Sequence, residues 1–164
     1  MLNNTKTILF ALMALANFAS ANAAHPAHQD SHSNHKITIT DPWIRSAPAN
    51  APALGLFMEI SNNTDQNIKL VSAHVEGYKR IELHRTVSNN GMMKMIRQDF
   101  MPIPAQGELH LKPGSWHIML IGPNRVPSKN EKIMASLKFN NGSTQTIHAL
   151  VRKGKMMMKH HSKH

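Results

Sequence analysis

Residues 82–120 read ELHRTVSNNGMMKMIRQDFMPIPAQGELHLKPGSWHIML and contain two alternating runs separated by turn residues. Arg80–His84 and Trp116–Leu120 alternate as strands do, and the segment Asn89–Gly91 follows the first run. Alternation with a period of two is typical of β-strands, whereas Asn and Gly are typical of turns. The stretch therefore predicts two strands of a small β-domain, with a hairpin after the first.

Four side chains in this stretch have the character of copper ligands. Ten residues separate His84 from Met95, and twenty-one separate Met95 from His117. One residue separates His117 from Met119, and side chains at that spacing lie on one face of a strand. A thioether is a soft, neutral ligand that favours Cu(I), so two imidazoles with two thioethers predict a Cu(I) site.

Packing in a core is the alternative for each of these side chains. Methionine in a strand most often fills a core, and physical arguments alone leave this open for Met92, Met93, Met95 and Met101. Met93 has the strand parity of Met95, so it is also a candidate for a substitute or transient ligand. The residues expected in the core are Met58, Ile118, Trp43 and Trp116. His74 is expected either at the surface or with hydrogen-bond partners for its ring nitrogens.

The ligand spacing resembles that of the periplasmic copper(I) chaperones of the PCuAC type, over roughly residues 36–152. Three further segments are similar to that family: Gly91–Met95, Ile103–Ala105 and Leu111–Gly114. Arg85 and Thr86 stand where some members carry another methionine, so no fifth core ligand is expected. The resemblance implies a cupredoxin-like Greek-key β-barrel or sandwich.

The resemblance also implies a role in copper delivery. It implies handover of Cu(I) by ligand exchange to the copper A centre of cytochrome c oxidase subunit II, with a thiol-bearing copper chaperone as a further candidate partner. A four-ligand set leaves no open position for a substrate, which indicates a carrier and not an enzyme. Two alternatives stay open. One is a copper sequestration or resistance protein without a specific acceptor, and the other is an enzyme in which cleavage after Ala24 makes His25 an N-terminal copper ligand.

Composition limits the other classes. The 164 residues suffice for one domain with a core. The absence of cysteine excludes a disulfide framework, a lipid anchor on cysteine and a blue-copper centre. The formal net charge is +10, but the Lys and Arg residues are scattered. An acidic protein partner or an anionic membrane surface therefore fits better than nucleic acid, and solubility alone is an equal explanation.

Residues 1–23 have the features of a signal peptide. Lys6 supplies a positive charge, Ile8–Ala16 is an apolar run, and Ala21–Ala23 is a small-residue cleavage site. The apolar run is shorter than the roughly 20 residues that a bilayer span needs, so we expect no stable membrane insertion. The sequence predicts export to the periplasm with cleavage before Ala24, and a retained helix is the alternative.

Both ends of the mature chain are rich in metal-binding side chains. Residues 24–35 contain His25, His28, His32 and His35 and are expected to be a flexible segment, although a plain polar linker is the alternative. Imidazoles of this kind suit Cu(II), Zn(II) and Ni(II) about equally. Residues 153–164 are expected to be a tail, and the resemblance implies an auxiliary copper site there, formed by Met156, Met157, Met158, His160, His161 and His164.

The segment 36–152 is expected to form the copper-binding β-domain. Ile37–Thr40 alternates as a strand, Asp41 and Pro42 are expected to end it, and Trp43–Arg45 resumes an extended course. Further strands are expected at 55–60, 68–75, 133–139 and 144–151. The last two flank an Asn-Gly pair, which is typical of hairpins. No segment has a convincing helical period, so the predicted fold is all-β, as a sandwich or barrel.

Overall fold

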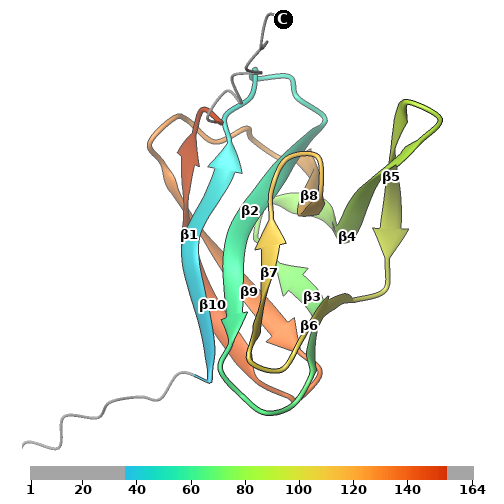
Figure 1. The fold of residues 1–164 in the computed structure, drawn as a ribbon. Coiled ribbons are helices and arrows are strands. Elements are labelled where there is room, and N and C mark those ends of the chain that lie inside the picture. Colours follow the sequence, from blue (N-terminus) through green and yellow to red (C-terminus); the bar gives the residue numbers. More distant parts are fainter. Residues whose placement is uncertain (1–35, 155–164) are drawn as a thin grey trace, which may run out of the picture. The chain divides into compact units, whose positions relative to one another are not determined.

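Strands make up the regular structure of the computed structural model, which describes residues 36–154 (Figure 1). The ten strands are β1 (Ile37–Arg45), β2 (Ala53–Asn62), β3 (Ile68–His74), β4 (Tyr78–Asn89), β5 (Met92–Gln98), β6 (Met101–Ile103), β7 (Gly107–Leu111), β8 (Trp116–Pro123), β9 (Lys132–Phe139) and β10 (Thr144–Arg152). No helix occurs within residues 36–154, and hence none that could cross a membrane. The predicted all-β class is confirmed.

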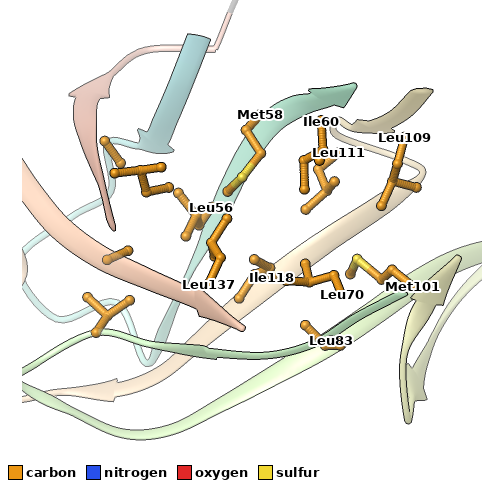
Figure 2. Close-up of a cluster of buried hydrophobic side chains, with 14 of the residues drawn as sticks. Leu56, Met58, Ile60, Leu70, Leu83, Met101, Leu109, Leu111, Ile118 and Leu137 are labelled. Carbon is orange, nitrogen blue, oxygen red and sulfur yellow. The ribbon is translucent and has the colours of Figure 1, made fainter. Parts of the chain in front are cut away.

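The strands form one sheet in the order β5-β4-β8-β7-β2-β1-β10-β9-β3-β6, with an additional β8–β2 pairing. Most neighbours are antiparallel, while β1–β10 and β7–β8 are parallel. The sheet wraps around a single core, because buried residues of β2, β3 and β9 belong to one cluster. Figure 2 shows this packing, with Leu56 of β2 beside Leu137 of β9 and with Leu70 of β3 close by.

The hairpin of β4 and β5 forms one end of the sheet. Asn90 and Gly91 join the strands, and both have positive φ angles, of 50° and 78°. Two consecutive left-handed residues are what a type I′ hairpin turn requires, which explains the Asn-Gly pair. Nearly all of β5 is exposed, and the hairpin stands out at one side of the molecule (Figure 1). The β9–β10 hairpin predicted around the second Asn-Gly pair is also confirmed.

β1 differs from the prediction because it continues through Asp41 and Pro42. The strand absorbs them in an irregularity of its pairing with β2 between Thr40 and Trp43, and Asp41 has a φ angle of 47°. Such a bulge shifts the alternation of the strand by one residue. As a result Ile44 takes the fully buried position that continues the core-facing side.

The prediction that Trp43 packs in the core is therefore wrong. Its ring lies against Phe57, with the ring centroids 4.6 Å apart, and the guanidinium of Arg152 lies 5.0 Å from its centroid. Trp116 is half-buried and packs against the core cluster, as expected. Met58 and Ile118 are buried, and His74 is exposed, which confirms these three assignments.

Candidate metal centre

The pairing of β4 with β8 places the two predicted histidine ligands opposite each other. His84 is the direct partner of His117 in this antiparallel ladder, and their ring centroids are 5.7 Å apart. Two pairs along the same ladder, Glu82 is opposite Met119, and in the β4–β5 ladder Thr86 is opposite Met95. Opposed residues of an antiparallel pair project to the same side, so β5, β4 and β8 bring the four predicted ligands to one face.

A cavity of about 190 Å³ opens on this face. Met95, His117 and Met119 line it, together with Thr86 and Phe57 among others. His84 is not part of the lining but lies beside it, opposite His117. Three of the four predicted ligands thus share a cavity, and the fourth is next to it.

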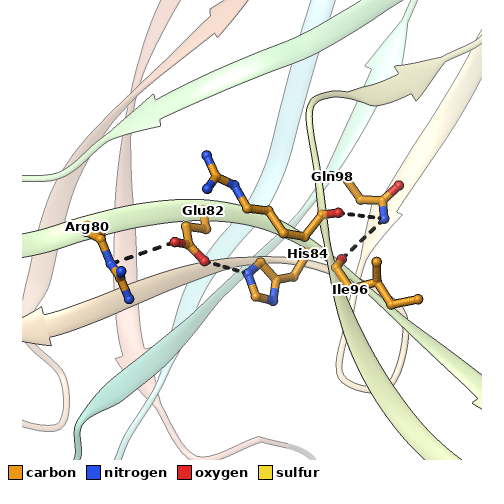
Figure 3. Close-up of polar contacts among 6 residues, drawn as sticks. Arg80, Glu82, His84, Ile96 and Gln98 are labelled. Atoms are coloured by element: carbon orange, nitrogen blue, oxygen red, sulfur yellow. Dashed lines mark hydrogen bonds and ion pairs between the residues drawn. The ribbon is translucent and has the colours of Figure 1, made fainter.

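Hydrogen bonds leave one nitrogen of each imidazole free. His117 Nδ1 lies 2.9 Å from the Ser115 carbonyl oxygen, and His84 Nε2 lies 2.9 Å from Glu82 Oε2 (Figure 3). Both oxygens only accept hydrogen bonds, so these two nitrogens carry the protons. His84 Nδ1 and His117 Nε2 are therefore lone-pair donors, and both are buried without a partner.

These two free nitrogens are costly unless something binds them. A buried polar atom without a partner costs about 1–3 kcal/mol, which is comparable to a large single-site mutation. A metal ion bound by both nitrogens removes this cost. The carboxylate that holds His84 is also typical of metal sites, where such a partner fixes the tautomer and orientation of the ligand. The residues present therefore fit a copper ion.

The protonation states suit metal binding. Burial, assisted by the charge of His84 and opposed by the Ser115 hydrogen bond, lowers the pKa of His117 below its usual 6.5. The hydrogen bond from His84 is the main factor that lowers the pKa of Glu82, with Arg80 and Arg97 acting in the same direction. The carboxylate is thus charged and the His117 imidazole neutral at neutral pH, the states that ligation requires.

Exposure separates the methionines that sequence left ambiguous. Met101 is fully buried and packs in the core, whereas Met92, Met93 and Met95 are 73%, 62% and 59% exposed. Large apolar side chains gathered on one exposed strand are not explained by core packing. Met119 is half-buried at the cavity. The exposure of Met95 at the rim allows it to serve as a ligand that is accessible from solvent.

A family model for LpqE-like lipoproteins matches residues 37–151. The chain belongs to the LpqE-like family. A relative from Leifsonia xyli subsp. xyli, named as the lipoprotein Lxx21020, is 30% identical over 142 residues, covering 85% of this chain and 81% of the relative.

Solved structures also resemble this LpqE-like chain. The solution structure of CuI-DR1885 from Deinococcus radiodurans has a TM-score of 0.61 at 29% identity, over 79% of this chain and 88% of that one. The copper-bound PCuAC domain from PmoF2 has a TM-score of 0.63 at 21% identity, over 73% and 94% of the two chains. These matches confirm the resemblance to PCuAC domains and the cupredoxin-like fold.

Several residues of the LpqE-like site were not identified from sequence. Glu82 holds His84, and its position two residues before that histidine, on the same face of a strand, was a signal that was available. Phe57 lies 6.3 Å from His117 between ring centroids and covers Gly55, where an added Cβ would come within 2.6 Å of the ring. A side chain at position 55 would therefore force the ring of Phe57 to move. No sequence signal pointed to the pair.

The predicted signal peptide and several predicted metal ligands lie outside the described residues. These are the signal peptide 1–23, the histidines of 24–35 and the six tail ligands Met156, Met157, Met158, His160, His161 and His164. Within residues 36–154 of the LpqE-like domain, no group of three or more His, Asp or Glu side chains is arranged to hold a metal.

Proposed function

We propose that this protein is a periplasmic copper chaperone that binds Cu(I) through His84, Met95, His117 and Met119. The observation that carries the proposal is the pair of buried, unpartnered imidazole nitrogens on opposed residues of β4 and β8. Two thioethers line the adjoining cavity. Thioether ligands favour Cu(I) over the harder divalent ions, and similar domains have been solved with copper bound.

Carriage fits this arrangement better than catalysis. Four protein ligands occupy the coordination positions of Cu(I), whereas catalytic metal sites keep a position open for substrate. Met95 is more than half exposed, so its thioether is the ligand that an incoming acceptor reaches first. Handover then proceeds by stepwise ligand exchange: each new bond from the acceptor replaces one from the chaperone, and copper stays in the Cu(I) state throughout.

The proposed acceptor is the copper A centre of cytochrome c oxidase subunit II, directly or through a thiol-bearing copper chaperone. Resemblance to PCuAC chaperones supports this choice of acceptor. The signal features of residues 1–23 support export to the periplasm. Lipidation on cysteine is not available to this chain, which contains none. The tails are proposed as auxiliary sites for Cu(I) and Cu(II).

A transfer experiment tests this function. The reference protein is the full chain in which the histidines of 24–35 and the histidines and methionines of 153–164 are replaced by alanine, here termed the tail-alanine chain. Loaded with one Cu(I) under anaerobic conditions, it is mixed with the apo soluble domain of subunit II, and copper in each protein is measured after separation. Stoichiometric transfer supports the proposal, and the matched control Met95→Ala/Met119→Ala should bind and transfer little. Tight binding without transfer to the oxidase domain would instead indicate sequestration.

A further inference from the structure

β5 carries two consecutive exposed methionines that face opposite ways. Met93 is opposite Ser88 and Met95 is opposite Thr86 in the β4–β5 ladder, so both of these thioethers lie on the ligand face. Met92 is adjacent to Met93 in the strand, so its side chain lies on the opposite face. Both Met92 and Met93 are more exposed than Met95, so neither fills the core.

The other described sulfur atoms do not extend the ligand face. Met58 and Met101 are buried in the core, and Met134 lines a separate pocket on β9. The rest of the cavity rim includes three residues without a soft donor, Arg45, Pro113 and Gly114. Within residues 36–154, Met93 is therefore the thioether that follows Met95 outward along β5.

We propose that Met93 is a transient ligand that holds Cu(I) while it enters and leaves the four-ligand site. This inference rests on the proposed chaperone function and names a further residue for its handover step. Residues two apart in a strand are separated by about 6.6 Å. The long, unbranched methionine side chain has three rotatable bonds. The sulfur atoms of Met93 and Met95 can therefore converge on one ion at the rim.

The exchange begins at the most buried ligand. His117 is 4% exposed, and its Nε2 points away from the Ser115 hydrogen bond. As copper moves outward with Met95 still bound, the Met93 thioether forms a bond to it and the bond to His117 Nε2 breaks. No electron or proton moves, because both ligands are neutral and copper remains Cu(I). Donor atoms of the acceptor then replace the four remaining ligands one at a time, with one bond formed for each bond broken: His84 and Met119 leave first, and the rim thioethers of Met93 and Met95 leave last.

The charge of the hairpin favours an acceptor at the same end. Residues 83–98 contain Arg85, Lys94 and Arg97 but no Asp or Glu. A positive segment beside the exit attracts an anionic acceptor, such as a protein that presents thiolates, and raises its rate of encounter. The exposed methionines and the positive charges thus lie on one hairpin.

Single substitutions in the tail-alanine chain test the proposal. Met93→Leu removes the sulfur but keeps the size and apolar character of the side chain, and Met92→Leu is the matched control on the opposite face. Stopped-flow transfer of Cu(I) to the chromophoric chelator bicinchoninate gives the release rate, and competition titration gives the affinity. Met93→Leu should slow release by about tenfold, which corresponds to about 1.4 kcal/mol in the barrier. Loading should slow by the same factor, because a transient ligand leaves the affinity unchanged.

Each outcome of this experiment bears on a separate statement. Equal release rates for Met93→Leu, Met92→Leu and the parent would overturn the transient role. A loss of affinity for Met93→Leu as large as that for Met95→Leu would also overturn it, because Met93 would then be a resident ligand. Failure of the parent to bind Cu(I) tightly would contradict the proposed function itself, and the titration reports this before any rate is measured.

Discussion

Replacing Met95 by alanine should weaken copper binding while leaving the stability of the apo protein nearly unchanged. Met101→Ala should instead destabilise the apo protein and leave its Cu(I) affinity nearly unchanged. Met95 is 59% exposed at the cavity rim, whereas Met101 is fully buried in the core. Substitutions at exposed sites typically change the free energy of unfolding by less than about 0.5 kcal/mol. Truncation of a buried methionine costs about 2–5 kcal/mol because it leaves a cavity. The two methionines therefore separate ligation from packing.

The expected loss of copper-binding free energy in Met95→Ala is of similar size to the loss of stability in Met101→Ala. Loss of an outer partner of a metal ligand typically weakens affinity about 10–100-fold, so loss of a ligand should cost about 100-fold or more. At free Cu(I) of about 1,000 times the parent Kd, binding stabilises the parent by about 4.1 kcal/mol. A hundredfold weaker variant is stabilised by only about 1.4 kcal/mol under the same conditions. The difference is large enough to measure.

Chemical unfolding of the apo and Cu(I)-loaded tail-alanine chain, under anaerobic conditions, measures both quantities for each variant. Met95→Leu serves as a control that keeps the apolar surface but not the sulfur, and it should behave like Met95→Ala. The assignment of Met95 to an exposed ligand position is refuted if Met95→Ala lowers the apo unfolding free energy by about 2 kcal/mol or more. It is equally refuted if copper stabilises Met95→Ala as much as the parent.

Three further outcomes are expected. Glu82→Ala should lower the Cu(I) affinity by about 10–100-fold in competition titrations, because the ring of His84 loses the carboxylate that orients it. Glu82→Gln keeps a side-chain oxygen that accepts the hydrogen bond, so its affinity should fall less. A Cu(I) affinity of Glu82→Ala equal to that of the parent would contradict this role. The Cu(I) affinity should fall as the pH is lowered, because protons compete with copper for the imidazole ligands. The pKa of His117 lies below 6.5, so the loss of affinity due to His117 should appear below that pH. A Cu(I) affinity that does not change with pH would indicate that only sulfur ligands bind copper. Arg125 holds the pKa of Glu131 down to about 2, so this pair stabilises the fold above the usual carboxyl pKa of 4.5 and the contribution disappears as the pH falls through about 2. Arg125→Gln should remove this contribution in acid unfolding curves, and unchanged curves would show that the pair adds nothing.

The hairpins and the shared strand face of His117 and Met119 were predictable from sequence because both depend on local rules. The turn residues Asn90 and Gly91 adopt the positive φ angles that their chemistry favours. Side chains alternate between the two faces of a strand, so the spacing of His117 and Met119 predicted that they share a face. The structure places His84 directly opposite His117. Sequence spacing alone does not reveal such a direct pairing, since it depends on the register of two strands that are distant in the chain.

The misplaced and missed residues depend on non-local geometry. The core assignment of Trp43 is wrong because the irregularity between Thr40 and Trp43 reverses the alternation of β1. Asp41 and Pro42 indicated an interruption there, but the local pattern does not show whether a strand ends or continues through a bulge. The lack of room for a side chain at position 55 arises because the ring of Phe57 lies over Gly55. Exposure likewise separated Met101, which packs in the core, from the exposed methionines of β5, and exposure is a property of the whole fold.

The most direct test of the central claim is the X-ray absorption spectrum of copper in the tail-alanine chain loaded with one Cu(I). His84, Met95, His117 and Met119 predict a first shell of two imidazole nitrogens and two sulfur atoms, and Met95→Ala should remove one sulfur. A shell without imidazole, or one without sulfur, would contradict the ligand set and the account of the protein as a Cu(I) carrier built on this face of the sheet.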